Sequence, residues 1–226
     1  MNNGSSTVDI FLRHGTIVTM DPERRILVDG SIAIANGKIT SVGPDKDIAP
    51  SLKSSVVRDL HGAVVHPGLV DAHVHTGLDL IRGLVSESTA DWTDVETPFI
   101  NSRTAKDDYL STLICCMEMV SNGSTIYADT GSSYDLDATA EATKLVGARG
   151  MPGAFLADQA GEIDGWLAPL DECLNTLDAQ SKRYPFQNGG IVRCAISLSG
   201  LETASDQILI ESKMLANKLV APMILH

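Results

Sequence analysis

The first sixty residues alternate short β-branched segments with turn-forming residues, a pattern typical of β-structure. The clearest signal is the pair Asn36 and Gly37, which follows the apolar position Ile34 and precedes Ile39. Asn-Gly between such segments predicts a two-residue hairpin, because both turn residues must adopt positive φ. We therefore expect residues 1–62 to form a small β-rich half-sandwich, in which no cluster of residues indicates chemistry.

From residue 63 onward the pattern changes to apolar strands that alternate with amphipathic helices. Strands are predicted at 63–75, 124–129, 152–158, 191–199 and 222–226, and helices at 104–123, 136–150, 166–184 and 205–219. Thr104 with Asp107 three residues later predicts a helix N-cap, and Gly123 predicts the end of that helix. Strands that alternate with helices of this length predict an α/β fold with a parallel sheet.

The number of predicted strands limits the architecture. Residues 63–226 supply five strands, whereas a closed eight-stranded barrel takes about 250 residues. An open five-stranded sheet is the alternative, although ending on an uncovered strand would leave an unpaired edge. The pattern alone leaves both arrangements open.

Composition and charge exclude some classes of function but say little about the fold. Hydrophobic residues make up 43% and charged residues 20% of the 226-residue chain, as in folded globular proteins. The formal net charge of −12 disfavours binding to nucleic acid and to anionic membrane surfaces. The N-terminus carries no pattern of a secretion signal, and no apolar stretch approaches the ~20 residues of a membrane helix. The four cysteines lack metal-knuckle spacing, so we expect reduced thiols and a cytoplasmic location.

Histidines end two of the predicted strands. His73 and His75 take alternate positions at the end of 63–75, so both side chains face the same side, about 7 Å apart. His226 ends the strand 222–226. Because the carboxyl ends of parallel strands meet at one edge of a sheet, three imidazoles could converge there on one metal ion.

Plainer interpretations of the histidines stay open at this point. A His-x-His pair is common by chance, and His226 is equally compatible with a frayed chain end. We interpret His14, His61 and His66 as surface or supporting residues, since they precede the strand end or lie in the β-rich part.

The segment HPGLVDAHVHTGLDLIRG, residues 66–83, resembles the strand-one signature of the amidohydrolase superfamily. Within that superfamily it is most similar to the branch of the cytosine deaminases and chlorotriazine hydrolases. Four further segments resemble the same branch in the same order: SIAIANGKITSVGP, ADWTDVETP, CMEMVSNGSTIYAD and PMILH. The joint match is far more specific than His-x-His alone, and it covers nearly the whole chain.

The resemblance implies a metal-dependent-hydrolase fold, a distorted (β/α)8 barrel with an N-terminal β-rich half-sandwich. Residues 1–62 would form the half-sandwich, and residues 63–226 would form a partial barrel of about five of the eight strands. We therefore expect the chain to be a fragment of a longer protein.

The resemblance also implies a site. His73, His75 and His226 would bind one divalent metal ion, with zinc favoured over iron. The family's catalytic glutamate and strand-eight aspartate would lie beyond residue 226, so no catalytic residue is assigned within the chain, and we expect the chain alone to be inactive. Binuclear members carry a lysine on strand four, and its absence from 191–199 favours a single ion.

Departures from the branch bear on the substrate. Adenosine-type deaminases usually carry an acidic residue after the proline of the strand-one loop, where this chain has Phe99 and Ile100. They also tend to have a histidine near the end of strand four, where this chain reads Leu198-Ser199-Gly200. Both departures argue against a ribose-bearing purine.

Several other side chains carry no assigned role. Arg82 and Trp92 match family-typical positions near the mouth of the site, and a structural role is equally open for each. Asp158, Gln159 and Glu162 follow the predicted third strand and could line a pocket, but Asp158 could equally cap the next segment.

The leading hypothesis is a metal-dependent hydrolase that cleaves C–N bonds of a heterocyclic amine or amidine with metal-activated water. A hydrolytic dechlorinase of a triazine-like ring is one alternative. A non-catalytic half-barrel that binds a partner is another. The expected partner is a small heterocyclic substrate, with no nucleic acid and no membrane, and a homo-oligomer is left open.

Overall fold

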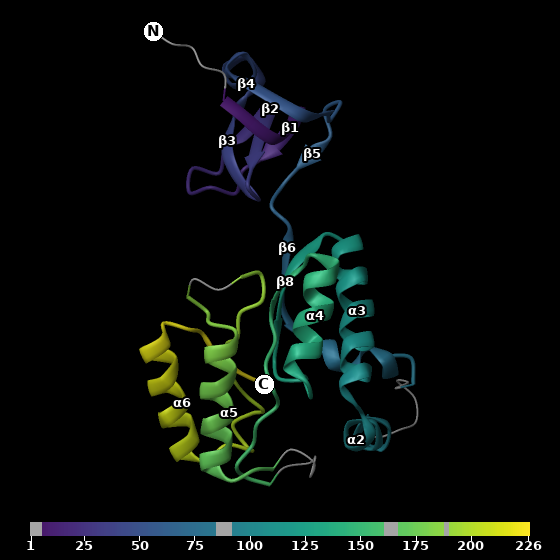
Figure 1. Ribbon diagram of the computed structural model, residues 1–226, viewed down its shortest axis with the longest axis vertical. Coiled ribbons are helices and arrows are strands. Elements are labelled where there is room, and N and C mark those ends of the chain that lie inside the picture. The colour runs from purple at the N-terminus through teal and green to yellow at the C-terminus, as the bar shows by residue number, and fades with distance from the viewer. Residues whose placement is uncertain (1–5, 85–91, 161–166, 188–189) are drawn as a thin grey trace. The chain divides into compact units, whose positions relative to one another are not determined.

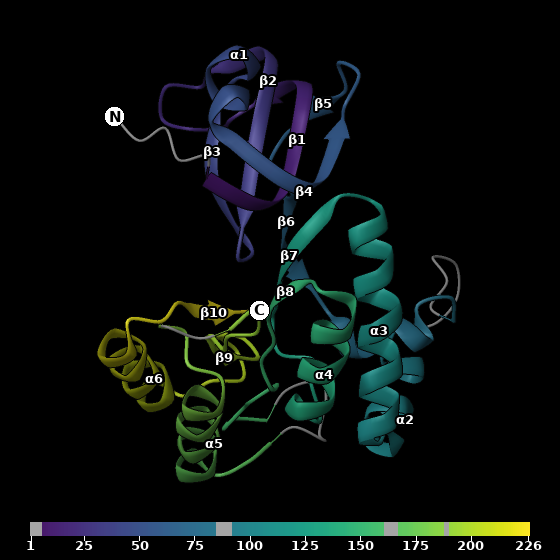
Figure 2. The same ribbon diagram turned by 45° about the horizontal axis from the view of Figure 1, so that its top comes forward.

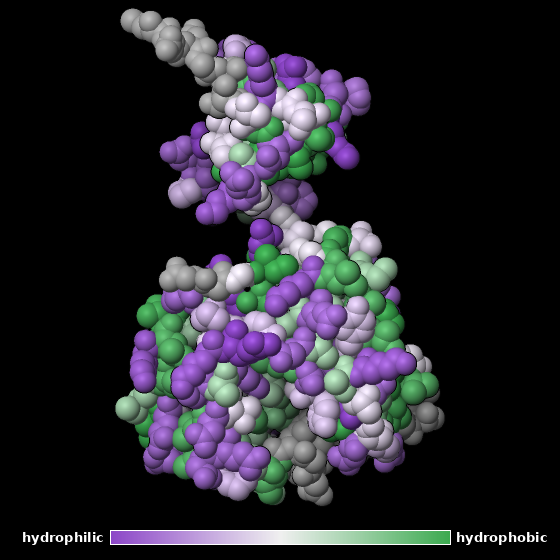
Figure 3. All heavy atoms as spheres, in the orientation of Figure 1, coloured by the Kyte–Doolittle hydropathy of each residue, from purple (hydrophilic) through white to green (hydrophobic). Residues whose placement is uncertain are grey.

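The computed structural model describes residues 6–84, 92–160, 167–187 and 190–226 (Figure 1). Contacts divide the chain into two compact units, Met1–Pro67 and Gly68–His226. Hydrophilic and hydrophobic residues are interspersed over the visible face of each unit (Figure 3). Among the described residues, no helix has the length and apolar character needed to cross a bilayer.

The first unit is built around one sheet with the strand order β3-β2-β1-β4, and β5 pairs with β1. The strands are β1 (Ser6–Val18), β2 (Ile26–Ala35), β3 (Lys38–Pro44), β4 (Leu52–Asp59) and β5 (Val64–Val65), and the short helices are α1 (Asp45–Ile48) and η1 (Ala49–Ser51). The hairpin predicted between β2 and β3 is confirmed, since Asn36 and Gly37 have φ angles of 52° and 70°. Because β5 joins this sheet, the contacts group residues 63–67 with the first unit.

A buried carboxylate ties the first sheet to α1. Asp45 accepts hydrogen bonds from the Arg13 guanidinium at 2.8 and 2.6 Å and from the Ser31 hydroxyl. The hydrogen bonds from Arg13 and Ser31 outweigh burial and lower the pKa of Asp45 to about 2. The core beneath consists of Val8, Phe11 and Ala33, together with Ile48.

The second unit places parallel strands beside pairs of helices (Figures 1 and 2). Its strands are β6 (Leu69–Val74), β7 (Ser124–Asp129), β8 (Arg149–Met151), β9 (Ile196–Leu198) and β10 (Met223–Leu225). Its helices are η2 (Thr76–Ile81), α2 (Trp92–Ser102), α3 (Ala105–Ser121), α4 (Leu136–Val146), α5 (Leu170–Arg183) and α6 (Asp206–Leu219). The strands form two parallel sheets, β6-β7-β8 and β9-β10, and an isolated parallel bridge joins Gly150 to Val192. The α/β fold with parallel pairing is therefore confirmed.

Helix ends follow the local sequence signals. The Asp107 carboxylate accepts hydrogen bonds from the Thr104 backbone N–H at 2.8 Å and from its hydroxyl at 2.7 Å, which confirms the predicted N-cap of α3. The Ser205 hydroxyl caps α6 by accepting from the Ile208 N–H at 3.2 Å. Gly147, with φ of 83°, ends α4 in the left-handed conformation that glycine adopts at little cost.

Several predicted elements differ from the structure in their bounds or in their type. The third strand lies at 149–151 rather than 152–158, because Pro152 has no N–H to continue the ladder, and only isolated bridges follow. Helix α5 begins after Pro169 rather than at 166, since proline fits the start of a helix and disfavours helical backbone before it. Helix α2 occupies a stretch that was interpreted as a loop, with Pro98 inside it.

Strand β9 is completely buried. All three residues of β9, Ile196, Ser197 and Leu198, have no solvent-exposed surface, as their near-continuous apolar character predicted. Ile196 and Leu198 pack against Cys173 and Leu177 of α5 and residues of α6 in the largest core of the second unit. All four cysteines are free and buried, as expected of reduced thiols.

Candidate metal centre

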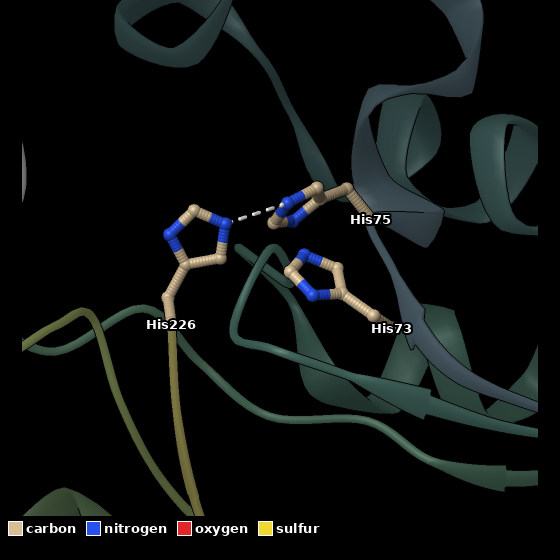
Figure 4. Close-up of side chains that lie close together, drawn as sticks. All are labelled: His73, His75 and His226. Carbon is tan, nitrogen blue, oxygen red and sulfur yellow. Dashed lines mark hydrogen bonds between the residues drawn. The ribbon is translucent and has the colours of Figure 1, made fainter.

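Three histidines from distant parts of the chain meet at one edge of the second unit (Figure 4). The ring centroids of His73 and His75 are 5.3 Å apart, and that of His226 lies 5.1 and 4.9 Å from them. One nitrogen from each ring can be chosen so that all three lie within 4.8 Å of one another. The structure thus brings together the three residues proposed from the sequence.

The histidines stand at the carboxyl ends of strands from both parallel sheets of the second unit. His75 follows the last residue of β6, and His226 follows the last residue of β10. Because β6 runs parallel to β7 and β10 runs parallel to β9, each of these strands ends beside the end of its partner. His73 and His226 are exposed and His75 is partly buried, so the cluster opens to solvent on one side.

The donor set fits a divalent cation such as zinc. The Nε2 atoms of His75 and His226 face each other at 3.2 Å. Two nitrogen ligands of one tetrahedral zinc ion lie about 3.3 Å apart, because each Zn–N bond is 2.0–2.1 Å long. Burial is the main cause that lowers the pKa of His75; the Asp129 carboxylate opposes it, and the neighbouring imidazoles lower the pKa further. The net lowering favours the neutral ring that binds metals.

A carboxylate behind the cluster fixes the backbone on both sides of it. Asp129, at the end of β7, is completely buried and accepts five hydrogen bonds. Its Oδ2 accepts from the Thr76 N–H, the Thr76 hydroxyl and the Ser132 hydroxyl at 3.0, 2.6 and 2.7 Å. Its Oδ1 accepts from the N–H groups of Gly131 and Ser132 at 2.9 and 2.7 Å. One side chain therefore joins the residue after His75 to the loop after β7.

A buried charge pair supports the same loop from the other side. Arg103 donates a hydrogen bond to the Ser132 carbonyl at 2.6 Å, and its guanidinium lies 3.7 Å from Asp108. Asp108 in turn accepts from the N–H groups of Tyr134 and Asp135 at 2.6 and 2.7 Å. Burial lowers the pKa of Arg103 and raises that of Asp108. The two residues hold residues 132–135 in place.

Sequence reasoning missed this supporting set. Asp129 ends an apolar strand and stands directly before Thr130-Gly131-Ser132, and a carboxylate followed by small and polar residues is a signal for an Asx-type turn. The bonds from Thr76 carry no such local signal, since they depend on the pairing of β6 with β7.

A cavity of about 410 Å³ adjoins His75 between β6, η2, α2 and α3. Its lining residues are Asp71, Val74, His75, Leu78, Asp79, Ile81, Arg82, Glu96, Cys115, Glu118 and Met119. Arg82 is the one cation of this lining, and Glu118 binds it at both guanidinium nitrogens, at 2.6 and 2.9 Å. The remaining charges are carboxylates, so the cavity favours neutral or cationic molecules over anions.

The other residues singled out from the sequence lie as follows. Asp158 accepts from the Ser205 N–H at 2.7 Å at the start of α6, and Gln159 donates its N–H to the Thr203 carbonyl. Ile100 and Leu198 are buried. Glu162 and the side chain of Trp92 lie outside the described residues. His14, His61 and His66 belong to the first unit, where His14 pairs with Asp29.

Comparison with known proteins places this fold and site in a family. The family model described as "Amidohydrolase family" matches residues 64–226. The chain therefore belongs to the amidohydrolase family.

Individual relatives are deaminases and a chlorohydrolase. The 5-methylthioadenosine/S-adenosylhomocysteine deaminase of Syntrophobacter fumaroxidans is 29% identical over 226 residues, which cover 99% of this chain and 50% of the relative. An adenosine deaminase from Xanthomonas campestris, with bound zinc, superposes with a TM-score of 0.78 at 21% identity over 98% of this chain and 49% of its own. Atrazine chlorohydrolase TrzN from Arthrobacter aurescens TC1, in complex with zinc, superposes with a TM-score of 0.79 at 21% identity. The match covers 96% of this chain and 52% of the chlorohydrolase chain. The chain thus spans about half the length of each.

Proposed function

We propose that the protein containing this chain is a metal-dependent hydrolase that cleaves a C–N bond of a heterocyclic amine or amidine. The observation that carries the proposal is the convergence of His73, His75 and His226 from two strand ends. In this proposal, residues 68–226 form part of a (β/α)8 barrel with about five of its strands, and the histidines lie at the mouth.

The three imidazoles would hold one divalent ion, with zinc favoured over iron. Such an ion, when bound, lowers the pKa of water toward neutrality and so supplies a nucleophile at ordinary pH. His75 contributes a ring whose pKa is lowered by burial, and Asp129 holds the backbone that carries it. Zinc in two solved neighbours of the same fold supports the choice of metal.

Acid–base groups are a separate requirement. In this proposal, the proton-transferring glutamate and the last metal-binding aspartate come from a part of the protein that follows residue 226. Positioned proton transfer typically contributes 10²–10⁴-fold to a rate. We therefore expect residues 1–226 to bind zinc while turning over substrate at background rates.

Two features bear on the substrate. The cavity beside His75 carries Asp71, Asp79 and Glu96, which favours neutral or cationic nitrogen-rich rings. Ile100, the second residue after Pro98, is buried and apolar, so it offers no acceptor for ribose hydroxyls. A named deaminase among the relatives supports deamination, and the chlorohydrolase neighbour supports dechlorination as the second candidate.

The first test is metal content. Purified residues 1–226 should bind about one equivalent of zinc, and His73→Ala, His75→Ala and His226→Ala should each lower zinc affinity at least 100-fold, since each removes one of three ligands. His61→Ala is the matched control, because His61 is exposed and lies in the first unit. Unchanged zinc binding in all three variants would contradict the proposal and favour a non-catalytic binding module.

The second test is turnover in the protein translated from the whole reading frame that holds these residues. A panel of aminopurines, pterins, aminotriazines and chlorotriazines should release ammonia from the amines if the protein is a deaminase. Release of chloride alone would favour the dechlorinase. His75→Ala in the same protein should abolish either product.

A further inference from the structure

The ring of His75 is contacted at both nitrogens, and only one contact faces the metal centre. Nε2 lies 3.2 Å from Nε2 of His226, while Nδ1 lies 3.4 Å from the hydroxyl oxygen of Thr130 (Figure 4 shows the first contact). A neutral imidazole carries one proton, and the partner of one nitrogen decides which nitrogen keeps its lone pair. The partner at Nδ1 therefore controls what Nε2 can do.

Thr130 is held in place from several directions. It is 3% exposed, and its N–H donates to the Val74 carbonyl at 3.4 Å. It stands between Asp129 and Gly131, whose N–H binds the Asp129 carboxylate at 2.9 Å. A β-branched side chain on such a fixed backbone has few rotamers, so the hydroxyl stays opposite His75.

The other end of the contact is tied to the same carboxylate. Thr76, the residue after His75, binds Asp129 through both its N–H and its hydroxyl. Asp129 thus fixes the backbone beside His75 and the backbone beside Thr130 together. The distance between the imidazole and the hydroxyl is set by one rigid unit rather than by two independent loops.

We propose that Thr130 is a positioning residue, whose hydroxyl oxygen accepts the Nδ1 proton of His75 and so directs the Nε2 lone pair into the histidine cluster. The opposite arrangement would leave a proton on Nε2 that points at Nε2 of His226, where the ion is expected. This inference rests on the proposed function for its relevance to metal binding, but the choice of tautomer is a property of the chain itself.

Two variants of Thr130 distinguish the effect of its hydroxyl group from the effect of its side-chain volume. Thr130→Val removes the acceptor at nearly constant volume, and Thr130→Ser keeps the hydroxyl. Thr112→Val is the matched control, because Thr112 is completely buried and its hydroxyl has no hydrogen-bond partner among the described residues.

The first measurement uses metal-free residues 1–226. Long-range ¹⁵N–¹H correlation spectra of the imidazoles should show His75 with its proton on Nδ1 in the parent, in Thr130→Ser and in Thr112→Val. Thr130→Val should populate the Nε2–H form. A parent with the proton on Nε2, or an unchanged tautomer in Thr130→Val, overturns the inference.

The second measurement is zinc affinity by competition with a chelator. Loss of a partner that orients a metal-binding histidine typically costs 10–100-fold in affinity, so this drop is expected for Thr130→Val. Thr130→Ser and Thr112→Val should stay within a few-fold of the parent. Equal affinities in Thr130→Val and Thr112→Val overturn the positioning role, whereas failure of the parent to bind zinc overturns the proposed function and leaves the tautomer result to stand.

Discussion

Buried aspartates hold turns together in both units of the molecule, and Asp45 and Asp129 are satisfied by different chemistry. Asp45 in the first unit is paired with a cation, Arg13, and with the Ser31 hydroxyl. Asp129 in the second unit accepts five bonds from backbone N–H groups and hydroxyls, with no salt bridge to it among the described residues.

The difference matches what lies beside each carboxylate. Asp45 anchors a helix to a sheet, and the described residues of its unit contain no group of potential metal ligands. Asp129 stands behind histidines proposed to bind a cation, where a neighbouring arginine in contact would repel that ion. Neutral donors make all five hydrogen bonds to this carboxylate, while Arg103 binds the Ser132 carbonyl of the same loop instead.

The largest loss of stability should come from removing the Asp129 carboxylate, which the neutral donors bind. Asp129→Ala leaves five donors without their acceptor in a fully buried place. Orphaned buried donors cost about 1–3 kcal/mol each, with partial relief as water enters, so a loss of about 3–5 kcal/mol in the free energy of unfolding is expected. Urea denaturation followed by circular dichroism measures it.

The control for that variant is Asp178→Ala, which removes an exposed carboxylate whose partner is Lys182 on the same helix. It should change stability by less than about 0.5 kcal/mol. A loss below about 1 kcal/mol in Asp129→Ala would show that the network is dispensable. Asp129→Asn should lie between the two, since the amide keeps one acceptor oxygen.

The second effect is a pH dependence that belongs to the first unit. The folded-state pKa of Asp45 is about 2, below its unfolded value of 3.8. A depressed pKa stabilises the fold above the unfolded pKa, and this contribution is lost as pH falls through 3.8 toward 2. It amounts to about 2 kcal/mol at 1.36 kcal/mol per pKa unit.

Urea midpoints measured between pH 6 and pH 2 for the parent and for Asp45→Asn test this effect. The parent should lose stability over that range more steeply than the variant. Equal slopes would show that Arg13 does not hold the carboxylate in its charged form. Zinc binding at pH 7 should be the same in both proteins, since Asp45 lies in the other unit.

The smallest expected effect tests whether a change in the first unit alters zinc binding in the second. Gly37→Ala places a side chain at φ of 70° with no neighbouring atom within 4 Å, so only backbone strain opposes it. About 1 kcal/mol of destabilisation is expected. Thermal unfolding should register this loss while zinc affinity stays unchanged, and a fall in zinc affinity would show that the two units are energetically coupled.

Local signals in the sequence predicted much of this molecule. The turn at Asn36 and Gly37 and the cap at Thr104 depend on residues within a few positions, so both can be predicted from the local sequence. The meeting of His75 with His226 was also predicted, because strand ends in parallel α/β folds share an edge.

Interactions set by tertiary pairing were not predictable in the same way. Nothing near Asp129 in the sequence indicates that Thr76, 53 residues earlier, would bind it. The pairing of Arg103 with the Ser132 carbonyl likewise follows from the way α3 packs beside β7. Helix α2 was not predicted, because the resemblance indicated a loop at residues 90–98 and a proline inside a helix is unfavourable.

The separation of the histidines along the chain gives the ion a second role. His75 and His226 are 151 residues apart, whereas the contacts around Asp129 close loops of at most 55. Closing the longer loop costs on the order of 1 kcal/mol more chain entropy, and a cross-link of that span restricts an unfolded polypeptide the most. A cation bound by these histidines would therefore act as a reversible cross-link. The thermal unfolding temperature should increase when metal is added and decrease when it is removed, even without substrate.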